Sequence, residues 1–290
     1  RKAVSSIGAI TKAMEVVAAI KMRKSEEVAL DSRPYAYKAL ELLERLSRSS
    51  RIDSIYTKER EIKKTLVIVI TSDRGLIGSF NSQVLRVAEN FISPDSLFVA
   101  VGRKADAYFI KKNLPQVRKF YGFGDFVEVS EISELYNFLT LGFEKGKWDR
   151  VVTLSMHFRS ALKQETLVRE ILPVNVEKIR ETVREIIPEY GRYSDEKEAK
   201  EDNREIEYIF EPSKKELIEK LIPHLIKMQV YHLILEANAS EHAARYVAMK
   251  NASDSAEELS ENLIIQYNKA RQGAITSELV EMSATQSALE

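Results

Sequence analysis

The final part of the chain contains almost none of the residues that interrupt helices. From His224 to Leu289 there is no proline and a single glycine, Gly273, and residues that lose little conformational freedom in a helix predominate. Ser213 and Glu216 have the spacing of a capping box, and Pro223 is expected to kink or restart the helix near its first turns. Residues 213–290 therefore predict one very long helix.

The length of this helix limits how the chain can fold. At about 1.5 Å per residue, the uninterrupted part would be about 100 Å long. A compact chain of 290 residues has a radius of gyration of only about 19 Å. Because such a helix cannot fold away inside a body of that size, we expect it to protrude.

A second long helix is predicted at the other end, in residues 1–50, with interruptions at Gly8 and Pro34. Apolar residues recur in both segments at alternating steps of three and four, the spacing of a coiled-coil seam. The seam residues are Ile7, Ile10, Met14 and Val17, then Leu225, Met228, His232, Leu235, Ala239, His242, Tyr246 and Met249, and then Ala252, Ala256, Leu259, Leu263, Gln266, Ala270 and Gly273. We expect the two helices to pair as an antiparallel coiled coil; the alternative, that each stripe packs on the central domain, stays open.

Residues 63–210 between the helices have an α/β pattern. Residues 65–71 form a continuous β-branched apolar run, which is typical of a strand buried on both faces. Further strands are predicted at 96–101, 150–157, 165–172 and 205–210, and helices at 82–91, 103–112 and 130–145. Their alternation favours a mainly parallel sheet with covered faces. The highly charged stretch 189–207 predicts a solvated loop.

Composition excludes several classes of protein. With 44 basic and 44 acidic residues the net charge is zero, which argues against extensive nucleic-acid binding. With no cysteine there can be no disulfide, thiolate metal site or cysteine nucleophile. No uninterrupted apolar run approaches the length of a membrane span, and no signal pattern is visible, so we expect a water-soluble chain.

Motifs for catalysis are weak. The string Gly75-Leu76-Ile77-Gly78 follows a predicted buried strand, but it matches neither the dinucleotide-binding nor the P-loop pattern, so a tight turn is favoured. His232 and Glu236 lie one turn apart, as a metal pair can, but no third ligand is in register, and a role in setting the helix register is favoured. The patterns of serine hydrolases and zinc peptidases are absent. We therefore predict no catalytic, cofactor-binding or metal-binding residues.

Charge is unevenly placed on the two helices. Residues 1–24 carry six basic residues against Glu15 alone, whereas residues 276–290 carry three acidic residues and no basic one. A solvated helix face is the simplest explanation. A basic shaft would also be attracted to acidic loops on a surrounding partner.

Three separated parts of the chain carry a family resemblance. They are residues 10–19 (ITKAMEVVAA), residues 71–78 (TSDRGLIG), and the C-terminal pair 240–252 (SEHAARYVAMKNA) and 267–278 (YNKARQGAITSE). In this order they resemble the gamma subunits of F-type ATP synthases. The family usually has additional residues before the first string, so we expect this N-terminus to be truncated or processed. The sequence after Glu281 departs from the family pattern, including Thr285 and Gln286.

The resemblance implies a fold and a function. The expected fold class is α/β, with an antiparallel coiled coil of long N- and C-terminal helices and a central Rossmann-like, mainly parallel α/β domain. The expected function is that of a non-catalytic rotor shaft in a proton-translocating synthase, without a cofactor of its own. Its partners would be the alpha and beta subunits, the epsilon subunit and the membrane rotor ring. It would lie on the cytoplasmic face of the bacterial inner membrane, peripheral and not inserted.

The resemblance also implies contact residues, carried over by position. Met14, Glu241 and Arg245 match the region that meets the acidic loop of the beta subunits. The upper contact with the ring would involve Arg271, Gln272, Thr276 and Glu278, and the foot near epsilon and the membrane ring would involve Tyr208 and Glu211. Without cysteine, the thiol switch of chloroplast relatives cannot operate here.

Two other hypotheses remain. The chain could be an enzyme built on the α/β domain, with the helices as a dimerisation arm. It could also be a static tether or scaffold, whose helices would self-associate.

Overall fold

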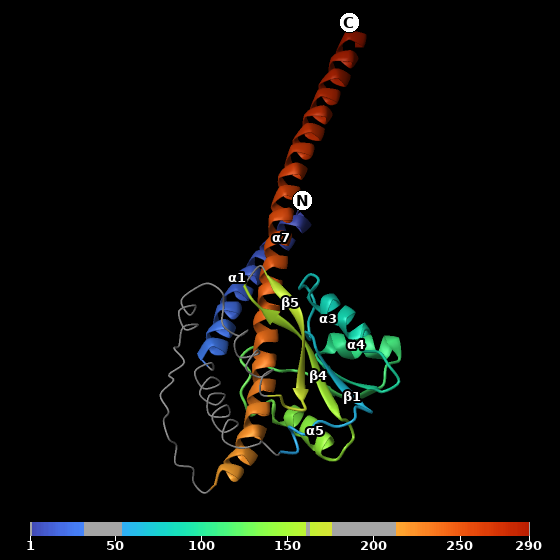
Figure 1. The fold of residues 1–290 in the computed structure, drawn as a ribbon. Helices are drawn as coiled ribbons and strands as arrows, with labels where there is room; N and C mark the ends of the chain where they lie inside the picture. The colour runs from blue at the N-terminus through green and yellow to red at the C-terminus, as the bar shows by residue number, and fades with distance from the viewer. Residues whose placement is uncertain (1, 32–53, 161–162, 176–212, 290) are drawn as a thin grey trace.

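The long C-terminal helix is present as a single element. The computed structural model describes residues 2–31, 54–160, 163–175 and 213–289. Helix α7 (Lys214–Leu289) has 76 residues and continues through Pro223 without a break. The Ser213 hydroxyl accepts a hydrogen bond from the backbone N–H of Glu216 at 3.3 Å, which confirms the predicted N-terminal cap. The C-terminal part of α7 projects far beyond the rest of the molecule (Figure 1).

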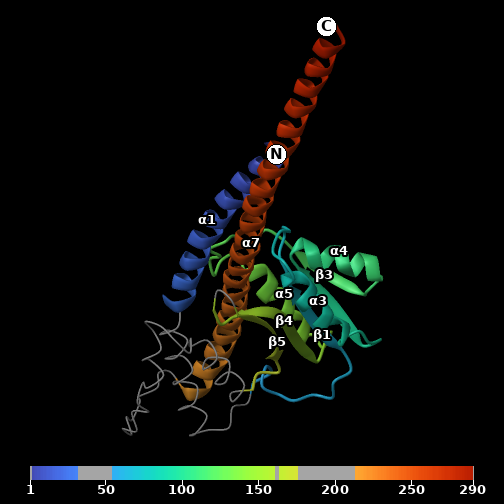
Figure 2. The same ribbon diagram turned by 90° about the horizontal axis from the view of Figure 1, so that it is seen from above.

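Helix α1 (Lys2–Asp31) runs antiparallel to α7 and beside it in both ribbon views (Figures 1 and 2). The predicted seam of α1 is wrong, however. Ile7, Ile10 and Val17 are 56%, 60% and 52% exposed, whereas Ala18 and Ser25 are buried.

The reason is the size of the side chains in the contact. Small residues allow two helix backbones to approach closely, and a Cβ placed on Gly8 would lie 3.4 Å from the Cβ of Ala256. The bulky apolar residues of α1 therefore occupy its outer side. On α7 the predicted seam is mostly buried as far as Met249, including Leu235 and Ala239. Beyond Met249 the prediction fails, because no seam residue there is buried and Leu259 is 49% exposed.

Within the described residues, the central sheet has five strands in the order β3-β2-β1-β4-β5. The strands are β1 (Thr65–Ile70), β2 (Ser96–Val101), β3 (Gln116–Phe120), β4 (Arg150–Phe158) and β5 (Gln164–Leu172). All neighbouring pairs are parallel except β4 and β5. The sequence did not predict β3, because this edge strand is mostly exposed and charged. The strand predicted at 205–210 and the loop at 189–207 lie outside the described residues.

Helices cover both faces of the sheet. α3 (Phe80–Glu89) and α4 (Arg103–Lys112) pack on one face, around Phe98 and Phe109. α5 (Ser133–Glu144) and the lower part of α7 pack on the other face, which holds a second and larger apolar cluster. The base of the long helix is therefore part of the core of the α/β body.

Candidate functional site

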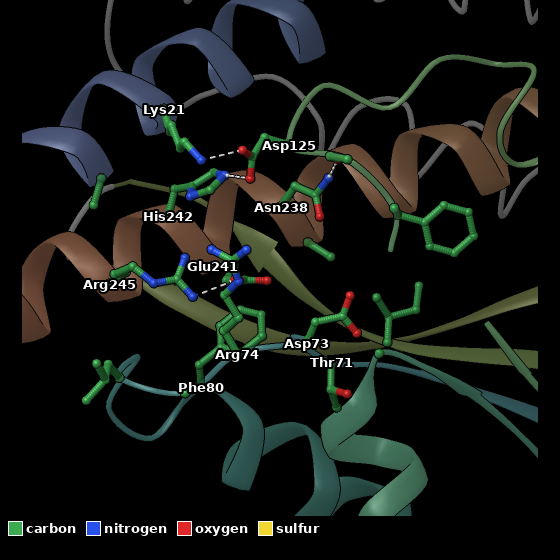
Figure 3. Close-up of a pocket in the computed structure, with 18 of the residues that line it drawn as sticks. Lys21, Thr71, Asp73, Arg74, Phe80, Asp125, Asn238, Glu241, His242 and Arg245 are labelled. Atoms are coloured by element: carbon green, nitrogen blue, oxygen red, sulfur yellow. Dashed lines mark hydrogen bonds and ion pairs between the residues drawn. The ribbon is translucent and has the colours of Figure 1, made fainter. Parts of the chain in front are cut away.

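A cavity of about 600 Å³ lies where the body meets the two long helices (Figure 3). It is lined by the ends of β1 and β2, by the loops that follow β1 and β3, and by one face each of α1 and α7. Parallel strands present their carboxyl ends at this edge, next to the point where strand order reverses. In open α/β sheets, this is where binding sites are usually found.

The loop after β1 is held by its own polar groups. The Asn81 side-chain oxygen accepts a hydrogen bond from the Ser72 backbone N–H at 3.1 Å. The carboxylate of Asp73 accepts the backbone N–H groups of Arg103 and Gly122, each at 2.9 Å. Asp73 therefore fastens this loop to the start of α4 and to the loop after β3.

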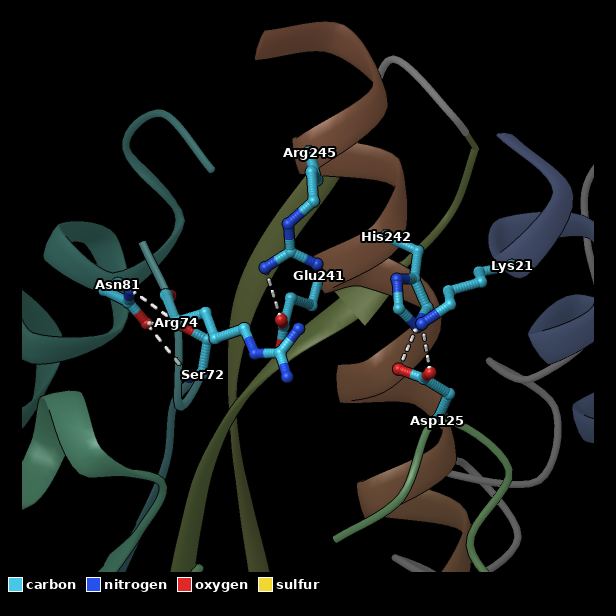
Figure 4. Close-up of polar contacts among 8 residues, drawn as sticks. All are labelled: Lys21, Ser72, Arg74, Asn81, Asp125, Glu241, His242 and Arg245. Atoms are coloured by element: carbon cyan, nitrogen blue, oxygen red, sulfur yellow. Dashed lines mark hydrogen bonds and ion pairs between the residues drawn. The ribbon is translucent and has the colours of Figure 1, made fainter. Parts of the chain in front are cut away.

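Asp125 joins three parts of the chain (Figures 3 and 4). Its carboxylate accepts hydrogen bonds from Lys21 of α1 and from Nε2 of His242 of α7, the latter at 3.0 Å. The neighbouring carbonyl of Gly124 accepts a bond from Asn238 of α7 at 2.8 Å. The loop after β3 thus clamps both long helices to the body.

This environment determines the charge of His242. Burial lowers the pKa of the imidazole to about 4, with further lowering by Arg245 and Lys21, although Asp125 opposes the shift. Burial raises the pKa of Asp125, but Lys21 and His242 more than offset this and the pKa is lowered. His242 is therefore neutral at neutral pH and too weak a base for proton transfer there.

Three contact residues expected from the resemblance meet at this cavity. Met14 of α1 and Glu241 and Arg245 of α7 all line it. Arg245 donates to Glu241 at 2.6 Å, one turn apart on the same helix. Burial raises the pKa of Glu241, against the opposing effect of Arg245.

Arg74, which sequence reasoning did not select as a contact, extends from the loop after β1 towards Glu241 (Figure 4). The signal was available, because Arg74 lies within the string 71–78 that carries part of the resemblance. The cavity therefore presents two arginines and a methionine on three different elements.

The other expected contact residues lie elsewhere. Those of the upper contact are all exposed on the projecting part of α7: Arg271, Gln272, Thr276 and Glu278. The structure does not bring them near the cavity. Tyr208 and Glu211 lie outside the described residues.

The histidine and carboxylate pair suggested by the sequence has a different arrangement. Glu236 accepts from Nη1 of Arg169 at 2.7 Å and contacts Nδ1 of His157 at 3.1 Å. Burial raises the pKa of this carboxyl, but Arg169 and His157 outweigh burial and lower the pKa to about 2. Within the described ranges no cluster of three or more His, Asp or Glu side chains could hold a metal ion.

The carboxylates around the cavity are held by contacts within the fold. Its three carboxylates, those of Asp73, Asp125 and Glu241, each have a hydrogen-bond partner within the fold. What the site offers is a recessed surface with projecting cationic and apolar side chains, which suits a protein partner.

Comparison with known proteins identifies the family. The family model described as ATP synthase matches residues 1–289. The ATP synthase gamma chain of Salinibacter ruber is 37% identical over 97% of this chain and 93% of the relative. The chain belongs to the ATP synthase gamma family. The gamma chain of Geobacter metallireducens is 38% identical over 94% of this chain and 90% of the relative.

Solved structures of ATP synthases contain chains with the same fold. A chain in the OSCP/F1/c-ring structure of the Euglena gracilis mitochondrial ATP synthase matches with a TM-score of 0.65 at 20% identity, covering 100% of this chain and 93% of that one. A chain in the central stalk/c-ring structure of the Tetrahymena thermophila mitochondrial ATP synthase matches with a TM-score of 0.59 at 24% identity, covering 84% and 99%. Both matches confirm the coiled-coil and α/β architecture expected from the sequence.

Proposed function

We propose that this chain is the central rotor shaft of a proton-translocating ATP synthase and has no catalytic site of its own. The observation that carries the proposal is a long antiparallel helix pair, rooted in an α/β body, in a member of the gamma family. We further propose three units: 1–50 and 213–290 as the shaft and 63–210 as the body.

Such a shaft can couple turning to chemistry because it is asymmetric. Each catalytic beta subunit in a ring of three alpha and three beta subunits would meet a different face of it. Contacts that differ between open and closed beta conformations would then convert the shaft's angle into nucleotide affinity. Rotation would exchange the roles of the three sites during ATP synthesis or hydrolysis.

The proposed contact surfaces are the cavity and the projecting part of α7. Met14, Glu241, Arg245 and now Arg74 would meet the acidic loop of a beta subunit at the cavity. Higher up, the ring would be contacted by Arg271, Gln272, Thr276 and Glu278. Tyr208 and Glu211 would approach epsilon and the membrane rotor ring at the foot.

The outer side of α1 supports a protein partner. Ile10 and Ile20 are 60% and 63% exposed there, on a helix that also carries several lysines and arginines. By length and composition alone, Lys2–Val28 could cross a membrane. Since α1 lies along α7, we assign its apolar outer side to the ring and place the chain as a peripheral subunit at the cytoplasmic face of a bacterial inner membrane.

The proposal is tested by reconstitution. The isolated chain should neither bind nor hydrolyse ATP, and it should confer ordered rotary turnover when mixed with alpha and beta subunits. Stoichiometric ATP binding by the isolated chain would instead support an enzyme. A homodimer in sedimentation, with no turnover in the mixture, would support a static scaffold.

A substitution at the cavity tests the beta contact. Met14→Lys adds a cation beside Arg245, and should lower the number of protons pumped per ATP hydrolysed more than it lowers stability, because the position is already partly open to a partner. Met14→Leu, which keeps volume and polarity, should behave like the wild type. Equal losses of stability and coupling in Met14→Lys would contradict the assignment.

A further inference from the structure

The base of α7 is buried on every side where it crosses the body. All eight residues from Val230 to Ala237 are buried. Leu233, Ile234 and Leu235 are consecutive, so they point in directions about 100° apart around the helix. Close packing constrains this segment through the shapes of its side chains, several of which are aliphatic groups of similar volume. Because exchanging one such group for another costs little, shape alone discriminates only weakly between neighbouring rotational settings.

One polar contact in this segment does have a direction. Glu236 of α7 meets Arg169 of β5 at 2.7 Å and His157 of β4 at 3.1 Å, and Nη2 of Arg169 lies 3.2 Å from the same His157 nitrogen. The three side chains are only 6%, 6% and 2% exposed. We call Glu236, Arg169 and His157 the buried triad. One turn further along, the Ser240 hydroxyl approaches the carbonyl of Met156 at 3.4 Å.

Stability alone is a poor explanation for the buried triad. Taking two opposite charges out of water costs about as much as their attraction returns, and well-packed apolar replacements are often neutral or stabilising. What a buried pair does provide is selectivity between arrangements. A slip of one residue would turn α7 by about 100° and move it by about 1.5 Å. Glu236 would then be buried without its cation, a strongly unfavourable state.

We propose that the buried triad fixes the rotational angle of α7 relative to the α/β body. Turning applied to the body would then reach the projecting helix without slip. Glu236, Arg169 and His157 are in this sense positioning residues, since they touch neither nucleotide nor the ring. The proposal rests on the rotor function proposed above. Asp125, which contacts Lys21 of α1 and His242 of α7 at the cavity, also joins α7 to the body, at a more exposed position.

The decisive variant replaces the buried triad by apolar residues of similar volume: Glu236→Met, Arg169→Met and His157→Phe together. Because the chain has no cysteine, Lys111→Cys on α4 and Lys250→Cys on α7 provide the only two labelling sites for spin-label distance measurement. Both positions are exposed. The control replaces an exposed ion pair of the body, Arg118→Met with Glu134→Met, which removes one charge of each sign away from α7.

In the free chain, we expect the triple variant to keep its urea midpoint while the distance distribution between the two labels broadens or moves. The control should keep the narrow wild-type distribution. In the reassembled synthase in vesicles, the triple variant should hydrolyse ATP but pump about twofold fewer protons per ATP, or fewer still. A stable triple variant with a wild-type distance distribution and wild-type coupling would overturn the proposal.

A second variant covers failure of the triple variant to fold. Arg169→Lys keeps the charge but loses the planar fork that reaches both Glu236 and His157, so it should also broaden the distribution. The double variant Glu236→Arg with Arg169→Glu, which exchanges the two charges, should have a narrower label-to-label distance distribution than Glu236→Arg alone. Unchanged distances in Arg169→Lys would overturn the proposal. The distances are measured on the free chain, so they remain interpretable even if the wild-type chain gave no rotary turnover and the rotor function itself failed.

Discussion

The base and the tip of α7 belong to one helix but are stabilised in different ways. In the base, residues 218–243, aliphatic side chains are buried against the sheet, α5 and α1, and the buried side chains of Glu236 and His242 both have polar partners. In the tip, residues 262–282, nearly every residue is exposed, including Ile265 at 66% and Val280 at 62%. Tertiary packing maintains the base, whereas intrinsic helix propensity maintains the tip.

Continuity between the two explains how the tip can be helical at all. An isolated helix has to nucleate its first turn at a considerable cost, and short helices are marginal in water. The tip avoids this cost because it extends a helix that the body has already formed. In the part of the chain that the structure describes, large apolar side chains of the tip such as Ile265 and Val280 remain exposed, so their burial adds little to the stability of the tip.

The comparison is tested most strongly by truncating one aliphatic side chain in each region. Leu235→Ala, at a fully buried position, should lower the free energy of unfolding by about 2–5 kcal/mol through lost burial and a cavity. Ile265→Ala should change it by no more than about 0.5 kcal/mol. Urea titration of the free chain measures the free energy of unfolding of both variants. Similar losses in the two variants would mean that the tip packs against another part of the chain.

A pH titration should reveal the buried histidine in the base. The pKa of His242 falls from about 6.5 in an unfolded chain to about 4 in the fold, so the unfolded state takes up the proton first as the pH is lowered. Stability should therefore fall from about pH 6.5 down to about pH 4, by about 2 kcal/mol between pH 7 and pH 5. His242→Gln should flatten this part of the profile, and an unchanged slope would exclude His242 as its source.

A local effect is expected in the tip. Gly273 is a helical glycine with no atom near the position of an added Cβ, so Gly273→Ala should stabilise the local helix by about 1 kcal/mol. Slower hydrogen exchange of the neighbouring amides in the free chain would show this. Gly142→Ala, whose Cβ would lie 1.9 Å from the Trp148 ring, should instead destabilise the body. Faster exchange around residue 273 would contradict a tip held by propensity.

The sequence predicted the elements with strong local signals. The absence of breakers defined α7, and the apolar run at 65–71 defined β1, because these patterns reflect burial and backbone preference directly. β3 was missed, since an exposed edge strand with Arg118 and Lys119 has no apolar alternation. The seam of α1 was misassigned because periodicity reports which residues share a face, and not whether that face meets this chain or another protein.

The candidate site was predicted in part. Met14, Glu241 and Arg245 were selected through the resemblance, and the structure adds that they share one cavity. Glu236 was considered only with His232, and Asp125 and the partners of Glu236 were not selected, because these contacts join side chains from distant positions. Arg74 was not selected either, although it lies within the string 71–78. The Glu236 partners are 67 and 79 residues away in sequence, a separation at which no local pattern operates.

The small side chains between α1 and α7 also determine how thick the axle is. With Gly8 against Ala256 and Ala18 in the contact, the two backbones can lie at the short end of the usual 8–10 Å interaxial range. The paired helices therefore form a slender rod, and larger side chains at Gly8 or Ala256 would push the two backbones apart and widen it.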